Sequence, residues 1–173
     1  MVNGMEGNLN DIFHMNLAGL EREWTKPATF GTPPSPRSGC AYAQRGDVAF
    51  VFGGYGIGFY NDLYMLDLSS YAWIKIEPTG SSPPPARFYS SMTMVNDDRS
   101  LFVCGGRRDN VFSDCWVFEI EENMWRELKN HKFDGRCEHT ASKVGNDIMV
   151  FGGTDVNKKI IKERNSFGRF SFE

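Results

Sequence analysis

Residues 50–73 read FVFGGYGIGFYNDLYMLDLSSYAW, and this stretch decides the fold. Its apolar run before Gly53-Gly54 is typical of a strand that is buried on both faces. The segment DLYMLDL, which starts at Asp62, alternates in the period-two pattern of a second strand. A further short segment, YAWIKI, carries Trp73. The stretch therefore predicts three consecutive strands joined by short loops.

The same pattern recurs one period later as FVCGGRRDNVFSDCWVFEIEENMW, residues 102–125. A third copy keeps MVFGG and departs after it, and an N-terminal copy keeps only Asn10-Asp11 and Trp24. Four landmarks recur in phase at about fifty residues: Arg37, Arg87 and Arg136; Gly53-Gly54, Gly105-Gly106 and Gly152-Gly153; Asp11, Asp62 and Asp114; Trp24, Trp73 and Trp125. Four independent landmarks with one period identify an internal repeat.

Each complete repeat predicts four short strands. We expect strands near 37–44, 47–53, 62–68 and 72–77, with counterparts one period later, and a helix only around 157–165. Pro-rich connections over 27–36 and 78–86 separate the repeats, and proline there cannot extend a hydrogen-bond ladder. The tail after Gly153 carries Phe167, Phe170 and Phe172, which would suit one more strand.

The landmarks have expected structural roles. The glycine pair allows a positive φ angle and a close approach by the neighbouring repeat. The Trp fills the wedge between adjoining sheets and leaves its N–H to find a backbone acceptor. The Asp accepts backbone N–H groups of the preceding turn. The Arg forms an ion pair or a hydrogen bond to the backbone, because a catalytic residue would not need to recur in every repeat.

The glycine pair, the Asn-Asp turn and the Trp together resemble the kelch-repeat family over roughly residues 8–153. The resemblance implies a β-propeller in which each repeat is one four-stranded blade. The expected fold class is all-β, with kelch-type blades of four antiparallel strands in an incomplete or open ring. We expect a single kelch-repeat domain over 1–173, divided into a partial blade at 8–26, blades at 37–77 and 87–129, and a partial, degenerate blade at 136–173.

The chain length conflicts with a closed ring. The 173 residues supply about three and a half blades, whereas propellers close with about four to eight. Open blade edges and faces favour association with other chains. The alternatives are a fragment, a truncated gene model, or a subunit whose open face another chain completes. Pairing of the two half-blades within one chain would give only about three blades, which is strained.

Composition excludes several classes of function. The 19 Lys and Arg residues against 22 Asp and Glu give a net charge of −3, so nucleic acid is not an expected partner. No apolar stretch is long enough to span a membrane, and no secretory signal is visible, so we expect a cytoplasmic protein. The cysteines show no zinc-site spacing and are expected to be reduced thiols: Cys40, Cys104, Cys115 and Cys137.

No catalytic constellation emerges from the sequence. The three histidines, His14, His131 and His139, are not grouped with one another or with other metal ligands. We therefore predict no catalytic residue, no cofactor and no metal. Kelch-type propellers do include copper oxidases and iron-using specifier proteins, so a metal-dependent oxidase or lyase is the alternative. A purely structural subunit of a larger assembly is another.

Function in a propeller usually lies in the loops at the two ends of the axis. The loops between second and third strands and those between blades emerge on one face, beside the Pro-rich connections. Aromatic and Arg side chains are typical of interface centres. The candidate partner-binding residues on that face are Tyr55, Phe59, Tyr60, Arg107, Arg108, Asn110, Lys158 and Lys159, with Lys162 and Arg164 beside the last two. The sequence thus predicts a non-catalytic protein–protein interaction or scaffold module whose partner carries an acidic segment.

Overall fold

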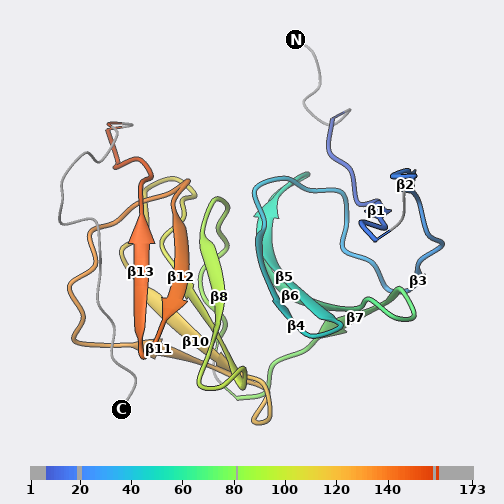
Figure 1. Ribbon diagram of the computed structural model, residues 1–173. Helices are drawn as coiled ribbons and strands as arrows, with labels where there is room; N and C mark the ends of the chain where they lie inside the picture. Colours follow the sequence, from blue (N-terminus) through green and yellow to red (C-terminus); the bar gives the residue numbers. More distant parts are fainter. Residues whose placement is uncertain (1–6, 19–20, 81, 158, 160–173) are drawn as a thin grey trace.

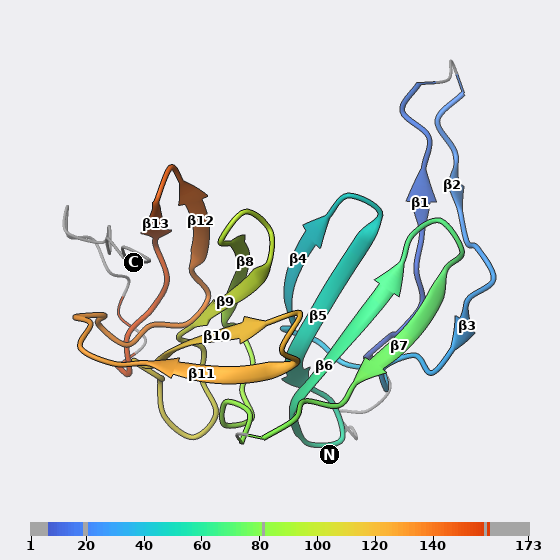
Figure 2. The ribbon, with the colours of Figure 1, turned by 90° about the horizontal axis from the view of Figure 1, so that it is seen from below.

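The structure is a computed structural model of the chain, and it describes residues 7–18, 21–80, 82–157 and 159. These residues form thirteen strands and no helix. The strands gather into units that follow one another across the molecule in sequence order (Figures 1 and 2). The all-β class and the repeated blades are as predicted, and the described residues form no closed ring.

Two complete blades occupy the middle of the array. Blade 2 comprises β4 (Ala41–Arg45), β5 (Val48–Tyr55), β6 (Phe59–Asp67) and β7 (Ala72–Ile76). Blade 3 comprises β8 (Ser91–Val95), β9 (Ser100–Cys104), β10 (Cys115–Glu119) and β11 (Met124–Leu128). Consecutive strands of each blade pair antiparallel, so each blade is a sheet in chain order.

A half-blade lies at each end of the array. Half-blade 1 consists of β1 (His14–Met15) and β2 (Trp24–Thr25), which match the third and fourth strands of a blade. Half-blade 4 consists of β12 (Thr140–Val144) and β13 (Asp147–Phe151), which match the first and second strands. Both ribbon views place these half-blades at opposite ends of the molecule (Figures 1 and 2).

The first strand of each repeat begins later than predicted. β4, β8 and β12 begin four residues after the repeated Arg rather than at it. The cause is a left-handed backbone at the second residue after that Arg, with φ of 65° at Gly39, 57° at Tyr89 and 61° at Glu138. A residue in this conformation turns the chain out of a strand, and this turn could not be read from the apolar pattern.

The Pro-rich connection 27–36 is not purely a loop, which corrects the sequence prediction. Within it β3 (Phe30–Gly31) pairs in parallel with the start of β7, with Phe30 opposite Ala72 and Gly31 opposite Trp73. Blade 2 is therefore a five-stranded sheet with β3 at its outer edge. The prolines flank this short pairing instead of entering it, because a proline has no N–H to donate.

The Trp of each complete blade is buried between blades, as predicted. The Trp125 ring lies 5.1 Å from that of Phe52 in blade 2 and 5.1 Å from that of Phe118 in its own blade. Trp73 packs with Tyr64 on the other side of blade 2, where Ile12 of the N-terminal segment joins the cluster. The prediction of a backbone acceptor is wrong for Trp73, whose indole N–H has no hydrogen-bond partner among the described residues.

Some predictions fall outside the described residues, namely most of the helix expected at 157–165 and the strand expected near Phe167, Phe170 and Phe172. All four cysteines are free thiols, and three of them are buried. Among the described residues, no helix has the length and apolar character needed to cross a membrane.

Candidate functional site

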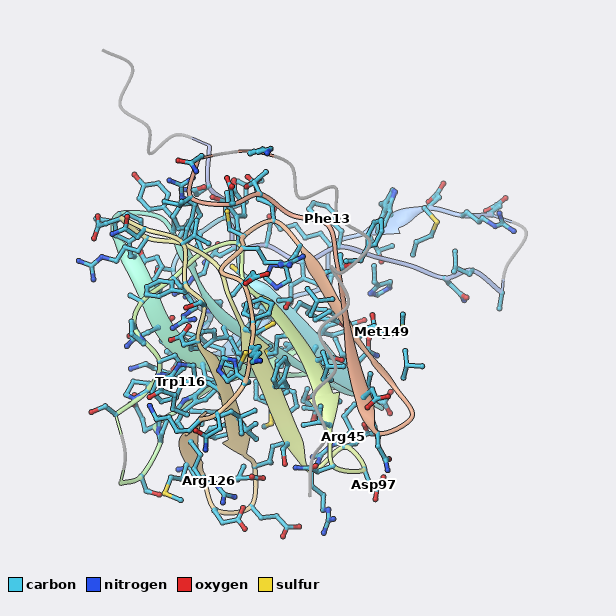
Figure 3. All side chains as sticks on the ribbon, turned by 90° about the vertical axis from the view of Figure 1, so that its left-hand side faces the viewer. Phe13, Arg45, Asp97, Trp116, Arg126 and Met149 are labelled. Carbon is cyan, nitrogen blue, oxygen red and sulfur yellow. The ribbon has the colours of Figure 1, made fainter. Side chains whose placement is uncertain are left out.

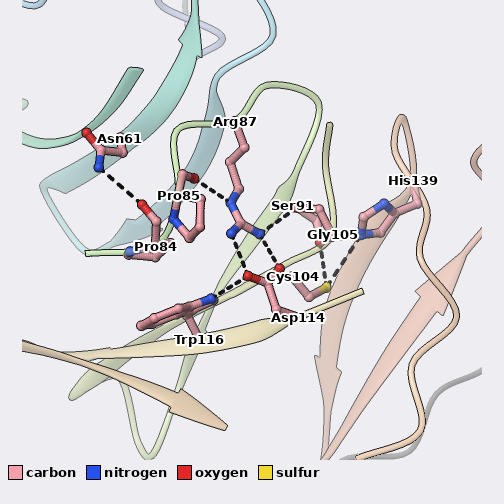
Figure 4. A network of polar contacts seen from close by, with 10 residues as sticks. All are labelled: Asn61, Pro84, Pro85, Arg87, Ser91, Cys104, Gly105, Asp114, Trp116 and His139. Atoms are coloured by element: carbon pink, nitrogen blue, oxygen red, sulfur yellow. Dashed lines mark hydrogen bonds and ion pairs between the residues drawn. The ribbon is translucent and has the colours of Figure 1, made fainter. Parts of the chain in front are cut away.

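The repeated Arg holds together the end of each complete blade where the candidate loops emerge. In blade 3 the guanidinium of Arg87 is fully buried. It donates to the two carboxylate oxygens of Asp114 at 2.6 and 2.7 Å, and to the carbonyl of Gly105 at 2.9 Å (Figure 4). Such a bidentate pair fixes both position and orientation. The structural role predicted for the repeated Arg is confirmed.

Blade 2 repeats this arrangement. Arg37 donates to Asp62 at 2.5 and 3.1 Å and to the carbonyl of Gly53 at 3.0 Å. The ring of Tyr60 covers its guanidinium, with 4.0 Å from the ring centroid to Cζ. Phe112 covers Arg87 in the same way at 4.2 Å. Tyr60, a predicted partner-binding residue, therefore contributes to this internal frame.

The charge of Arg87 changes the titration of its partner. Burial on its own would raise the pKa of Asp114, but hydrogen bonds from Arg87, together with its positive charge, hold that pKa below the ordinary value. Trp116 adds a hydrogen bond from its indole N–H at 2.7 Å. The carboxylate thus stays charged at neutral pH. The sequence predicted that it accepts backbone N–H groups of the preceding turn, whereas its hydrogen bonds come from the side chains of Arg87 and Trp116.

Main-chain hydrogen bonds join each blade to the next near the axis. The N–H of Tyr89 donates to the carbonyl of Gly39 at 2.8 Å, and the N–H of Glu138 donates to the carbonyl of Tyr89 at 3.0 Å. We call this chain of bonds the axial ladder. The second glycine of each pair adds to it, since Gly106 donates to the carbonyl of Arg136 at 2.8 Å.

An exposed aromatic cluster lies on the face formed by the predicted loops. We define the aromatic patch as Tyr55, Phe59, Phe88 and Tyr89. Its ring centroids are 5.2 Å apart for Tyr55 and Phe59, 5.7 Å for Phe59 and Phe88, and 4.8 Å for Phe88 and Tyr89. The guanidinium of Arg108 lies 5.5 Å from the Phe59 centroid. Loops of blades 2 and 3 thus bring aromatic rings and a cation to one surface.

The remaining candidates lie in different settings. Arg107 is half-buried, and its backbone pairs with that of Phe88. The carbonyl of Asn110 accepts from the N–H of Arg108 at 3.0 Å, which closes the exposed β9–β10 loop. Lys159 is exposed after half-blade 4, where its N–H donates to Asp155. Lys158, Lys162 and Arg164 lie outside the described residues.

Sequence reasoning missed Phe88 and Tyr89 as members of this surface. Both were assigned to a strand, yet they lie before β8 in the left-handed turn. The available signal was their size, because the same places hold the small pair Ser38-Gly39 in the preceding repeat and Cys137-Glu138 in the following one. Bulky aromatic residues at a position that is otherwise small or polar suggest a surface role.

A second cluster, of thiols and an imidazole, is buried between blade 3 and the segment that leads into half-blade 4. The hydroxyl of Ser91 is 2.9 Å from Nε2 of His139, which is 3.4 Å from Sγ of Cys104 (Figure 4). Burial would raise the pKa of Cys104, but hydrogen bonds from Cys115 and His139 lower it below the ordinary value. The described residues contain no group of three or more His, Cys, Asp or Glu side chains arranged to hold a metal ion.

Comparison with known proteins identifies the family. The family model of the KLHDC2/KLHL20/DRC7 Kelch-repeats domain matches residues 3–153. The chain is 38% identical over 135 residues to Kelch domain-containing protein 2 of Bos taurus, covering 75% of this chain and 33% of that protein. It is 38% identical over 144 residues to Kelch domain-containing protein 1 of Mus musculus, covering 79% and 35%.

A more distant relative is Host cell factor of Drosophila melanogaster, with 29% identity over 168 residues that cover 83% of this chain and 11% of that protein. The chain spans about a third of the length of the two Kelch domain-containing relatives. The family-model match covers nearly all of the described repeats, including both glycine pairs of the complete blades and all three Trp landmarks. The chain belongs to the kelch-repeat family.

Proposed function

We propose that this chain is a non-catalytic protein-interaction module that binds its partner at the aromatic patch and the basic loop beside it. The observation that carries the proposal is the cluster of four rings, three of them exposed and Phe88 half-buried, with Arg108 over Phe59. Large rings and Arg at the centre of a surface supply most of the affinity in many interfaces. The kelch-repeat relatives support an interaction role in general.

The rigid frame below the patch supports this role. The paired Arg37 and Arg87 hold the ends of blades 2 and 3, from which the loops emerge. A surface held in place before binding loses less conformational entropy when a partner docks. The frame therefore suits a surface that is preformed for its partner.

The local charge favours a partner with an acidic segment. Arg107 and Arg108 adjoin the rings in a chain whose net charge is −3. A carboxylate that approaches Arg108 gains a charge-assisted hydrogen bond, while an apolar neighbour packs on Phe59 or Tyr55. An acidic peptide segment with one aromatic or aliphatic anchor has the required chemistry.

Fluorescence polarisation with two labelled peptides tests this proposal. One is a twelve-residue peptide with Asp and Glu around a central Phe, and the other replaces each acid by its amide. We expect the acidic peptide to bind more tightly, and to lose affinity between about 50 and 300 mM salt. Arg107→Glu with Arg108→Glu should weaken it about tenfold or more, and Phe59→Ala should weaken both peptides.

Arg45→Glu with Arg99→Glu is the matched control, because it makes the same total charge change at the β4–β5 and β8–β9 turns, at the other end of blades 2 and 3. It should leave the affinity unchanged while circular dichroism confirms that every variant is folded. Equal binding of the two peptides, or equal loss from both charge changes, would place the binding surface elsewhere.

A further inference from the structure

The last strand of the array exposes a face that both complete blades bury. The residue directly before each glycine pair is Phe52 in β5, Cys104 in β9 and Phe151 in β13. Phe52 and Cys104 are 0% exposed, because the next blade covers them, whereas Phe151 is 68% exposed. Met149 is exposed too, on the side of the molecule that Figure 3 shows. The two complete blades thus serve as the comparison, and no blade within residues 7–157 covers β13.

The opposite end of the array exposes the complementary faces. Trp24 is 66% exposed, whereas its counterparts Trp73 and Trp125 are 6% and 0% exposed. Beside half-blade 1, a cavity of about 400 Å³ opens where two inner strands would lie. Its lining includes Ile12, Tyr42, Ala49, Val51 and Trp73.

Half-blade 1 nevertheless sits as the outer half of a blade should. The N–H of Arg37 donates to the carbonyl of Leu9, as the N–H of Arg87 donates to the carbonyl of Tyr60 one repeat later. Asn10 donates to the carbonyl of Pro34, and Asn61 likewise donates to that of Pro84. The outer strands are therefore in place, and the part of the chain that the structure describes supplies no inner strands for the same blade.

The Arg of the repeated ion pair lies beside half-blade 4 without its Asp, and the matching Asp lies beside half-blade 1 without its Arg. Arg136 is 3% exposed, yet among the described residues its guanidinium has only the carbonyls of Asp134 and Gly152 and no carboxylate. Asp11, which matches Asp62 and Asp114 in the repeat, pairs instead with the exposed Lys26 at 3.0 Å. A buried Arg without its acid and an Asp without its Arg lie at opposite ends of one chain.

We propose that a second copy of this chain completes both half-blades. In this arrangement β13 of one copy pairs with β1 of the other, as β5 pairs with β6. Phe151 then lies opposite Ile12, as Phe52 lies opposite Leu63, and it enters the cavity against Trp73, as Phe52 meets Trp125. Arg136 of one copy meets Asp11 of the other.

Two copies give a closed ring with the right number of blades. Each chain contributes two complete blades and two halves, so two chains give six blades, within the usual range of about four to eight. Closure within one chain would give three blades, and three chains would give nine. The two closures are identical, as the twofold symmetry of a homodimer requires.

A charge-exchange experiment on the full chain tests this dimer. Light scattering should give the wild type a mass of twice 19.6 kDa. Arg136→Glu and Asp11→Arg should each raise the dimer dissociation constant about 100-fold or more, because each places like charges together at both closures. Mixing the two variants should restore a dimer, since one closure then joins the two substituted side chains and the other joins Arg136 with Asp11.

A disulfide provides a readout that does not depend on a buried charge. Cys104 and Cys115 lie opposite each other on β9 and β10. The hydrogen bond from the N–H of Gly105 to the carbonyl of Asp114 shows that they form a non-hydrogen-bonded pair. The Cβ atoms of such a pair are close enough for a disulfide. Phe151 and Ile12 hold the same two positions. Phe151→Cys with Ile12→Cys should therefore give covalent dimers on mild oxidation, whereas wild type and Val144→Cys with Ile12→Cys should not.

A wild type that stays monomeric at all accessible concentrations would overturn the proposal. These faces would then not be the surface at which two copies join. Failure of the mixed variants to associate, or equal cross-linking of the two cysteine pairs, would also overturn it, whatever the outcome of the peptide-binding experiment.

Discussion

At the scale of the residue, the repeated Arg, Asp and Trp stabilise different parts of a blade. The Arg and Asp hold the loop end of the blade, while the Trp fills the space between blades. The sequence predicted the role of the Arg because it recurs in phase. It did not predict the Arg–Asp pairing, since two residues so distant in the sequence become partners only when strands one and three meet at one end of the sheet.

Trp73→Ala should lower the free energy of unfolding by roughly 3–5 kcal/mol, the range for truncating a buried aromatic side chain. Trp73 is buried and packs against Tyr64 and Ile12, so its truncation leaves a cavity. Urea denaturation followed by circular dichroism measures the change. Ile57→Ala is the control, because Ile57 is exposed and should change the free energy by about 0.5 kcal/mol or less. An unchanged midpoint for Trp73→Ala would contradict its burial between blades.

Asp114 should make stability depend on pH in the acid range. Its folded pKa lies below the ordinary value of 3.8, so the stabilisation is fully present above that value and is lost as the pH falls through the folded pKa. Urea denaturation between neutral pH and about pH 2.5 should show this loss. Asp114→Asn should be destabilised at neutral pH and should show a smaller acid dependence, whereas Asp98→Asn, in an exposed turn, should follow the wild type.

At the scale of the element, the glycine pair of each complete blade lies where the next repeat passes closely, within β5 in blade 2 and directly after β9 in blade 3. Cβ at Gly105 would lie 2.4 Å from the carbonyl oxygen of Arg136. The sequence predicted this close approach and the strand order. It misplaced the start of each first strand and missed β3, because the left-handed turn at Tyr89 and the pairing of β3 with β7 depend on contacts between segments rather than on local pattern.

Gly105→Ala should be more destabilising than Gly145→Ala by roughly 1–3 kcal/mol, the usual cost of overpacking. The two glycines have nearly the same backbone conformation, with φ of 61° and 62°, so the strain of a Cβ at positive φ is matched. A Cβ at Gly145 would meet no atom within 4 Å. Chemical denaturation of both variants isolates the contact with the next blade, and equal losses would show that backbone conformation alone requires glycine.

At the scale of the whole molecule, each blade is stabilised by its neighbours, as in other repeat proteins. The open array was predicted from the sequence, because the repeat period and the chain length together give the number of blades. The sequence predicted Tyr55 and Phe59 of the aromatic patch and missed Phe88 and Tyr89, because the rings come from β5, β6 and the segment before β8. Rings so far apart in the sequence gather only once the blades stand side by side.

The midpoint of thermal unfolding should rise with protein concentration if folding and pairing of two copies are linked. A tenfold increase should raise it by about 3 °C for a chain of this size. Differential scanning fluorimetry over two decades of concentration measures this shift. Arg136→Glu should remove the dependence on concentration, and a wild-type midpoint that does not move would argue against the linkage.

The axial ladder also bears on how this protein can change over evolution. Its bonds join main-chain atoms of Gly39, Tyr89 and Glu138, so no side chain takes part in them. A Cβ at Gly39 would lie 2.9 Å from the Tyr89 ring, which keeps that position a glycine. Tyr89 and Glu138 show that a large ring and an acid are both accepted at the equivalent positions, although the backbone there has a positive φ. Substitutions at these two positions by residues that accept a positive φ can therefore alter what the surface recognises while the ladder is kept, so new binding specificities can arise there one residue at a time.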